Sequence, residues 1–167
     1  SGTGKTSIGR SLSGELKIPF ISKDEFKDRI FNTLGIGDKT WSRKVSASAH
    51  RIMDYIIEEE LSSDHSIILE SNFKTEIDSE RFNKLQEKYG CKIIQLLATA
   101  RPDIIFERFM NRPDRNAGHV EELDQEEIRK SFLEPYKPLK VEGELIQIDT
   151  TDFKSVDIKQ LAQTISV

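Results

Sequence analysis

The first residues of the chain, SGTGKTS, have the types and spacing of a loop that binds phosphate groups. Glycines allow a tight turn whose backbone N–H groups face phosphate oxygens, and a helix that starts there adds its positive dipole end. The lysine can reach the phosphates, and the threonine hydroxyl can hold Mg²⁺. A disordered glycine-rich tag or an ordinary helix cap is the alternative. The residues assigned to nucleotide binding here are Gly2, Thr3, Gly4, Lys5, Thr6 and Ser7.

Asp24 follows a short apolar segment in the sequence PFISKDEF. A carboxylate at that place can accept a proton from a substrate hydroxyl, or it can help to hold Mg²⁺. The alternative is that Ser22 or Asp24 caps the helix that begins there. Arg29 comes five residues after Asp24 and is assigned to an anionic substrate, with a solvated helix residue as the equal alternative.

Glu70 ends the buried segment SIILE. Proteins that bind nucleotides with such a phosphate loop often have an acidic residue near Mg²⁺ at the end of a strand of this kind. We therefore predict Thr6 and Glu70 as the metal-holding residues. The alternative is a carboxylate that caps the following turn or helix. Asn72, two residues beyond, is expected to face the same crevice and is assigned to the substrate.

The sequence RFMNRPDRNAGH is basic and irregular. Arg108 and Arg112 are four residues apart, so they share one helix face, and Arg115 follows them. Arginines bind phosphate oxygens and stabilise charge on a transferring phosphoryl group. We predict a lid at about residues 112–124 that carries Arg112 and Arg115, and nucleotide contact for Arg108. A surface helix paired with neighbouring acids is the alternative.

Two further stretches are assigned to ligands. In QIDTTDF, Asp149 and Thr150 directly follow the last expected strand, and they could line the nucleotide base or cap the final helix. Residues 35–51 are expected to carry acceptor specificity because they lie beyond Asp24. There Arg43 is assigned to the substrate, and Trp41 either touches substrate or anchors the helix.

Apolar segments alternate with longer amphipathic ones, which predicts a parallel sheet with helices on both faces. Ligands then bind outside the carboxyl ends of the strands, where the residues above would converge. The expected strands are 19–21, 66–69, 91–98 and 145–148. The expected helices are 5–17, 24–34, 41–61, 76–89, 102–112, 125–133 and 155–165. Since a phosphate loop normally follows a strand, we also expect a first strand of ~8–12 residues before Ser1.

Composition bounds the remaining possibilities. The 167 residues suggest one domain spanning 1–167, and 36% hydrophobic with 32% charged residues is typical of a soluble protein. A net charge of −4 gives no support for nucleic-acid binding, and no apolar run is long enough for a membrane span. With a single cysteine there is no internal disulfide, so the cytoplasm is the expected compartment.

The order of these parts resembles the P-loop small-kinase group, which includes zeta-toxin-like and chloramphenicol-phosphotransferase-like proteins. The resemblance implies a three-layer α/β fold with a five-stranded parallel sheet in the order 2-3-1-4-5. It also implies ATP and Mg²⁺ as cofactors and phosphoryl transfer to a small-molecule hydroxyl. By the same resemblance, the expected catalytic residues are Lys5, Asp24, Arg112 and Arg115. Two departures are the absent first glycine of the loop and Glu70, where many relatives carry Asp.

We therefore expect an ATP-dependent kinase whose partners are ATP and a small-molecule acceptor, with no membrane and no assigned protein partner. Three alternatives remain open at this stage. A nucleotide-binding regulatory module would use the same loop without transfer, a zeta-like toxin would have a protein antitoxin, and a polynucleotide 5′-kinase would phosphorylate nucleic acid.

Overall fold

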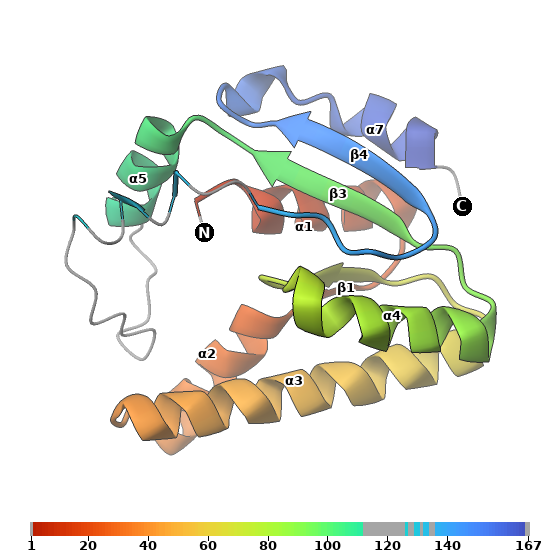
Figure 1. Cartoon of the computed structure of the whole chain (residues 1–167), viewed down its shortest axis with the longest axis horizontal. Helices are drawn as coiled ribbons and strands as arrows, with labels where there is room; N and C mark the ends of the chain where they lie inside the picture. The colour runs from red at the N-terminus through yellow and green to blue at the C-terminus, as the bar shows by residue number, and fades with distance from the viewer. Residues whose placement is uncertain (1, 112–125, 127–128, 131, 134–135, 166–167) are drawn as a thin grey trace.

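The computed structural model describes residues 2–111, 126, 129–130, 132–133 and 136–165, in which helices and strands alternate (Figure 1). The strands are β1 (Phe20–Ser22), β2 (Ile68–Glu70), β3 (Ile94–Thr99) and β4 (Glu144–Asp149). The helices are α1 (Lys5–Leu16), α2 (Lys23–Leu34), α3 (Lys39–Ser62), α4 (Thr75–Tyr89), α5 (Pro102–Met110), the 3₁₀ helix η1 (Phe153–Ser155) and α7 (Ile158–Ile165).

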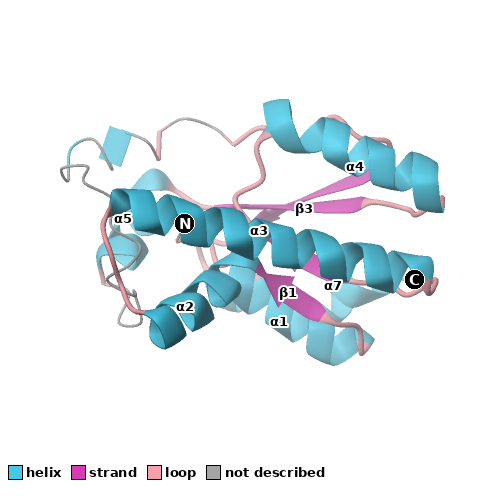
Figure 2. Cartoon of the chain, turned by 90° about the horizontal axis from the view of Figure 1, so that it is seen from below, coloured by secondary structure: helices cyan, strands magenta, loops and turns pink. Residues whose placement is uncertain are grey.

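All four described strands run parallel within their pairs, which confirms the predicted α/β class. Strand β1 pairs with β2 so that Ser22 lies opposite Glu70, and β3 pairs with β4 so that Thr99 lies opposite Asp149. The described strands form two separate pairs rather than one sheet, so the expected five-stranded order is not confirmed. Figure 2 shows α4 on one side of the strands and α1 and α7 on the other.

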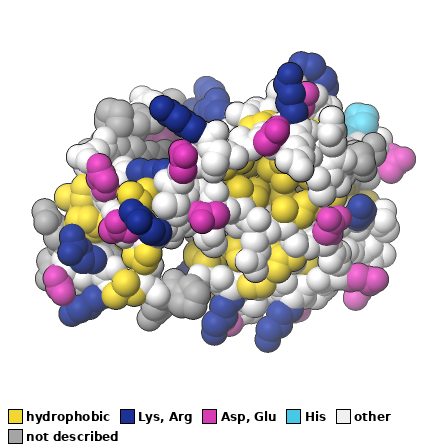
Figure 3. Space-filling view, turned by 90° about the horizontal axis from the view of Figure 1, so that it is seen from above, with side chains coloured by type: hydrophobic (Ala, Val, Ile, Leu, Met, Phe, Trp, Pro, Cys, Tyr) yellow, Lys and Arg dark blue, Asp and Glu magenta, His cyan; other side chains and the backbone are white. Residues whose placement is uncertain are grey.

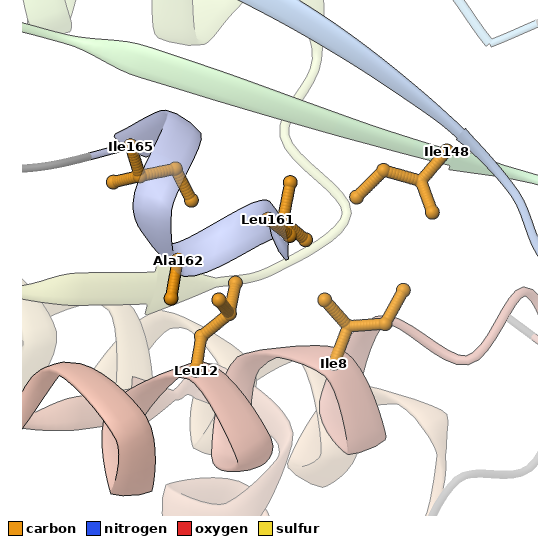
Figure 4. Close-up of a cluster of buried hydrophobic side chains, with 6 residues drawn as sticks. All are labelled: Ile8, Leu12, Ile148, Leu161, Ala162 and Ile165. Atoms are coloured by element: carbon orange, nitrogen blue, oxygen red, sulfur yellow. The ribbon is translucent and has the colours of Figure 1, made fainter. Parts of the chain in front are cut away.

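The core lies between α1, α7 and the strands. Ile8 and Leu12, four residues apart, are 2% and 0% exposed and pack with Ile148 of β4 (Figure 4). From α7, Leu161 and Ile165 complete the cluster. Partly buried side chains of β2 and β3 also pack against it, so α1 is held against both strand pairs. The apolar residues of α1 therefore form one buried face.

Helix α3 buries one narrow face. Its buried residues recur every four positions: Val45, Ala49, Met53 and Ile57. Ile52 points off this face and is 42% exposed. The helix begins two residues earlier than predicted, since the Asp38 side chain caps it by accepting from the Trp41 N–H at 2.7 Å.

Two other boundaries differ from prediction for identifiable reasons. Strand β3 begins at Ile94, three residues after the expected start, because its partner β4 begins at Glu144 and pairs with Ile94. The predicted helix 155–165 is two elements. Asp152 caps η1, and Asp157 caps α7 by accepting from the Gln160 N–H at 2.9 Å, so each Asp starts a new helical segment.

None of the helices in the described residues combines the length and hydrophobicity that a membrane span requires. Seen from above, hydrophobic side chains gather in the middle of the face and most charged side chains lie around them (Figure 3). Leu145 of β4 is 40% exposed.

The packing of α1 gives a first prediction. Leu12→Ala should lower the free energy of unfolding by about 2–5 kcal/mol, because the removed atoms leave a cavity in a packed core. Urea unfolding followed by circular dichroism measures the change. The matched control is Leu34→Ala, because Leu34 is 64% exposed and its loss should cost about 0.5 kcal/mol or less. Equal effects of the two variants would contradict the described core.

Candidate functional site

The predicted phosphate loop turns directly into α1. Gly2 (φ 79°) and Gly4 (φ 77°) both adopt the left-handed region that favours glycine. A Cβ at Gly2 would lie 2.7 Å from the carbonyl oxygen of Ile105, and one at Gly4 would lie 2.8 Å from the ring of Phe153. Helix α1 starts at Lys5, so unpaired N–H groups of its first turn lie beside the loop. Both backbone conformation and crowding therefore require glycine here.

The hydroxyl of Thr6 and the carboxylate of Glu70 meet beside this loop. Thr6 Oγ1 donates to Glu70 Oε2 at 3.3 Å, and the two residues come from the start of α1 and the end of β2. They are 64 residues apart in the sequence. The structure thus brings together the two residues that the sequence assigned to a metal.

Ser22, which the sequence suggested only as a helix cap, belongs to the same group. Its side chain is buried, and Oγ donates to Glu70 Oε2 at 2.7 Å. Although Ser22 occupies the N-cap position of α2, its side chain makes no capping hydrogen bond. The hydroxyl is used to hold Glu70 instead. The parallel register that places Ser22 opposite Glu70 is the signal that would have found it.

This donor set suits Mg²⁺. The ion prefers oxygen ligands, and it usually takes one or two from the protein and the rest from waters and phosphates. Thr6 and Glu70 supply a hydroxyl and a carboxylate on one edge of the phosphate loop. The described residues contain no cluster of three or more His, Cys, Asp or Glu side chains, so a site built wholly from protein ligands is not seen there.

Asp24 lies in the first turn of α2, two residues beyond Ser22, at the same end of the strands as Glu70. Its Oδ1 is 3.0 Å from Lys23 Nζ, and 40% of its side chain is exposed. The carboxylate is therefore partly exposed to solvent, and the ammonium group of Lys23 lies beside it.

The other predicted substrate residues are exposed. Arg29 lies on α2, Arg43 on α3, and Asn72 two residues beyond β2. Among the contacts of the described residues, none joins these side chains to Thr6 or Glu70. Their predicted contact with substrate stays a prediction.

Trp41 anchors the connection between α2 and α3. Its indole N–H donates to the carbonyl of Gly35 at 3.0 Å, and its ring lies against Gly37, where a Cβ would approach it to 2.6 Å. Of the two roles considered for Trp41, the anchor is the one that its contacts support. Burial lowers the pKa of His50, which lies further along α3, and the positive charges of Lys23 and Arg81 lower it further.

Arg108, Asp149 and Thr150 also come together. The guanidinium of Arg108 donates to the carbonyls of Thr150 at 2.9 Å and Thr151 at 3.1 Å. Asp149 accepts from the Thr151 N–H at 2.8 Å, which lowers the pKa of its carboxyl. Thr150 is fully buried, and its hydroxyl is 2.9 Å from the carbonyl of Thr3 in the phosphate loop. The loop after β4 is thereby tied to both α5 and the phosphate loop.

The predicted lid lies outside the described residues. Arg112 and Arg115 fall within it, and their assigned roles stay predictions.

Comparison with known proteins places this geometry in context. A family model described as an AAA domain matches residues 1–136. An inferred kinase from Chloroflexus aurantiacus shares 32% sequence identity with a TM-score of 0.88, over 98% of this chain and 90% of that chain. A sugar kinase from Janibacter sp. shares 18% identity with a TM-score of 0.55, over 99% and 87% of the two chains, which indicates a similar fold alone. No curated protein sequence matches the chain significantly.

The contact between Ser22 and Glu70 gives a second prediction. Ser22→Ala should weaken Mn²⁺ binding in the presence of ADP about tenfold, because the carboxylate loses the hydroxyl that orients it. Electron paramagnetic resonance of free Mn²⁺ measures the affinity. Ser48→Ala is the matched control, since the Ser48 hydroxyl only bonds Lys44 O on the exposed side of α3. Unchanged Mn²⁺ affinity in Ser22→Ala would rule out this role.

Proposed function

The chain belongs to the AAA domain family and to the P-loop small-molecule kinase group, and from this premise we propose that it transfers the γ-phosphoryl group of ATP to a small-molecule hydroxyl. The observation that supports transfer best is the contact of Thr6 and Glu70 beside the glycine loop, with Asp24 exposed at the same end of the strands. A nucleotide-binding loop, a metal-holding pair and an acceptor-side carboxylate are the parts that phosphoryl transfer needs.

On the nucleotide side, the backbone N–H groups of the loop and Lys5 hold the β- and γ-phosphates. Thr6 and Glu70 hold Mg²⁺, and Ser22 orients Glu70. When bound, the ion neutralises charge on the phosphate oxygens. The loop after β4, with Asp149 and Arg108, lies beside the base.

On the acceptor side, Asp24 orients the attacking hydroxyl and receives its proton. The hydroxyl oxygen forms a bond to the γ-phosphorus, the bond from phosphorus to the bridging oxygen breaks, and ADP leaves. Arg112 and Arg115 close over the transferring group and exclude water. Arg29, Arg43 and Asn72 contact the acceptor, whose identity the proposal leaves open.

The proposal extends to the sheet and to the cell. The order 2-3-1-4-5 would place one more strand, outside the described residues, between β2 and β3. The packing of α1 against side chains of both strand pairs supports a strand between them. We further propose one domain over residues 1–167, with a lid at about 112–124, and a cytoplasmic location.

Lys5 gives a third prediction. Lys5→Ala should lower ATP turnover at least ~100-fold, because the transferring phosphate loses the positive charge of the Lys5 side chain beside it. Release of ADP, measured by a coupled assay, tests this. The matched control is Lys159→Ala on the exposed side of α7, which should turn over like the parent chain. Comparable turnover in Lys5→Ala would refute the assigned role.

Asp24 gives a fourth prediction. With an acceptor identified from a panel of sugars, nucleosides, nucleotide sugars and antibiotics, Asp24→Asn should lower turnover ~10²–10⁴-fold while ADP affinity is retained. Glu25→Gln is the control, because Glu25 lies next to Asp24 but pairs with the exposed Arg10. Equal loss of transfer and ADP binding would exclude the role of Asp24. If ATP binds and no acceptor stimulates turnover, the regulatory module becomes the better explanation.

A further inference from the structure

Thr150 joins three segments that are distant in the sequence. Thr150 is fully buried, and its Oγ1 lies 2.9 Å from the carbonyl oxygens of both Thr3 and Thr99. Its own N–H donates to the Thr99 carbonyl at 2.7 Å. Since a hydroxyl carries one proton and Thr99 already has a donor, the Thr3 carbonyl is the acceptor that depends on the hydroxyl.

Arg108 sets the direction of that hydroxyl. It donates to Thr150 Oγ1 at 3.5 Å and, more strongly, to the Thr150 carbonyl at 2.9 Å. A guanidinium has no acceptor, so the hydroxyl oxygen accepts from Arg108 and its proton points toward a carbonyl. The loop after β4 is thus held from one side by α5 and bonds to the phosphate loop on the other.

The Thr3 carbonyl matters because of the peptide it belongs to. In a trans peptide the C=O of one residue and the N–H of the next point in opposite directions, and no cis peptide occurs in the described residues. A bond that holds the Thr3 carbonyl toward Thr150 therefore holds the Gly4 N–H pointing away from Thr150.

Little else in the loop fixes this peptide. Both neighbouring residues, Gly2 and Gly4, have the conformational freedom of glycine. Thr3 Oγ1 is buried and has no hydrogen-bond partner among the described residues, so the side chain of Thr3 does not hold the loop there. The carbonyl of Gly4 accepts from Ile8 N–H at 3.0 Å at the start of α1, whereas the Thr3 carbonyl lies before the helix.

We propose that Thr150 is a positioning residue for phosphate binding, which acts through the Thr3–Gly4 peptide and turns the Gly4 N–H toward the β-phosphate of a nucleoside di- or triphosphate. The inference rests on the proposed nucleotide-binding function of the loop. The Thr150 side chain does not itself touch the ligand, because it is enclosed between the phosphate loop, β3 and α5.

The test compares Thr150→Val with Thr150→Ser by calorimetric titration with ADP and with inorganic tripolyphosphate. Valine keeps the shape and removes the hydroxyl, so both affinities should fall about tenfold. Serine keeps the hydroxyl and should restore both, which a loss of packing alone would not do. Thr164→Val is the matched control, since the Thr164 hydroxyl bonds only Gln160 O on exposed α7. Thermal unfolding confirms that each variant is folded. If Thr150→Val does not fold, Thr150→Ala takes its place in the comparison.

The outcomes are distinguishable. Equal affinities of the parent chain and Thr150→Val would overturn the inference and leave the kinase proposal standing. A loss for ADP with none for tripolyphosphate would also overturn it, because Thr150 would then act on the base side. If the parent chain binds both ligands but phosphorylates no acceptor, the kinase proposal fails and the inference does not. If it binds neither, both fail.

Discussion

The burial of α1 is the constraint on which the site depends. Ile8 and Leu12 pack against β4 and α7, and because the phosphate loop ends where α1 begins, the core that fixes the helix also fixes the loop. The strands then bring the acidic residues to it. Parallel pairing of β1 with β2 puts Ser22 beside Glu70 at the carboxyl ends of both strands. The chemistry therefore gathers at one end of the strands although its residues are far apart in the chain.

Short hydroxyl side chains make the connections around the loop. Thr6 and Ser22 both bond Glu70 on one side, and Thr150 bonds the Thr3 carbonyl on another. Buried hydroxyls need partners, and Ser and Thr lose little side-chain entropy when they are fixed. They are well suited to hold a flexible glycine loop in one conformation from the protein interior.

Most of the fold could be predicted because its signals are local. The four-residue spacing of Ile8 and Leu12 is typical of a helix with one buried face, and the alternation of segments predicted the parallel α/β class. Strand ends were harder, because β3 starts where its partner allows and the partner lies 50 residues away. Asp152 caps η1 and Asp157 caps α7, so the two helical segments are separate. The helical pattern over 155–165 predicted one helix and did not indicate these caps.

The sequence by itself determined the donor side of the candidate site. The glycines, Lys5 and Thr6 all lie within residues 2–6, so their chemistry follows from spacing alone. The sequence also assigned Glu70 to the metal, but only the tertiary structure decided which other distant residues take part. Ser22 holding Glu70 and Thr150 bonding Thr3 span 48 and 147 residues, and such contacts depend on strand register and helix packing that no local pattern encodes.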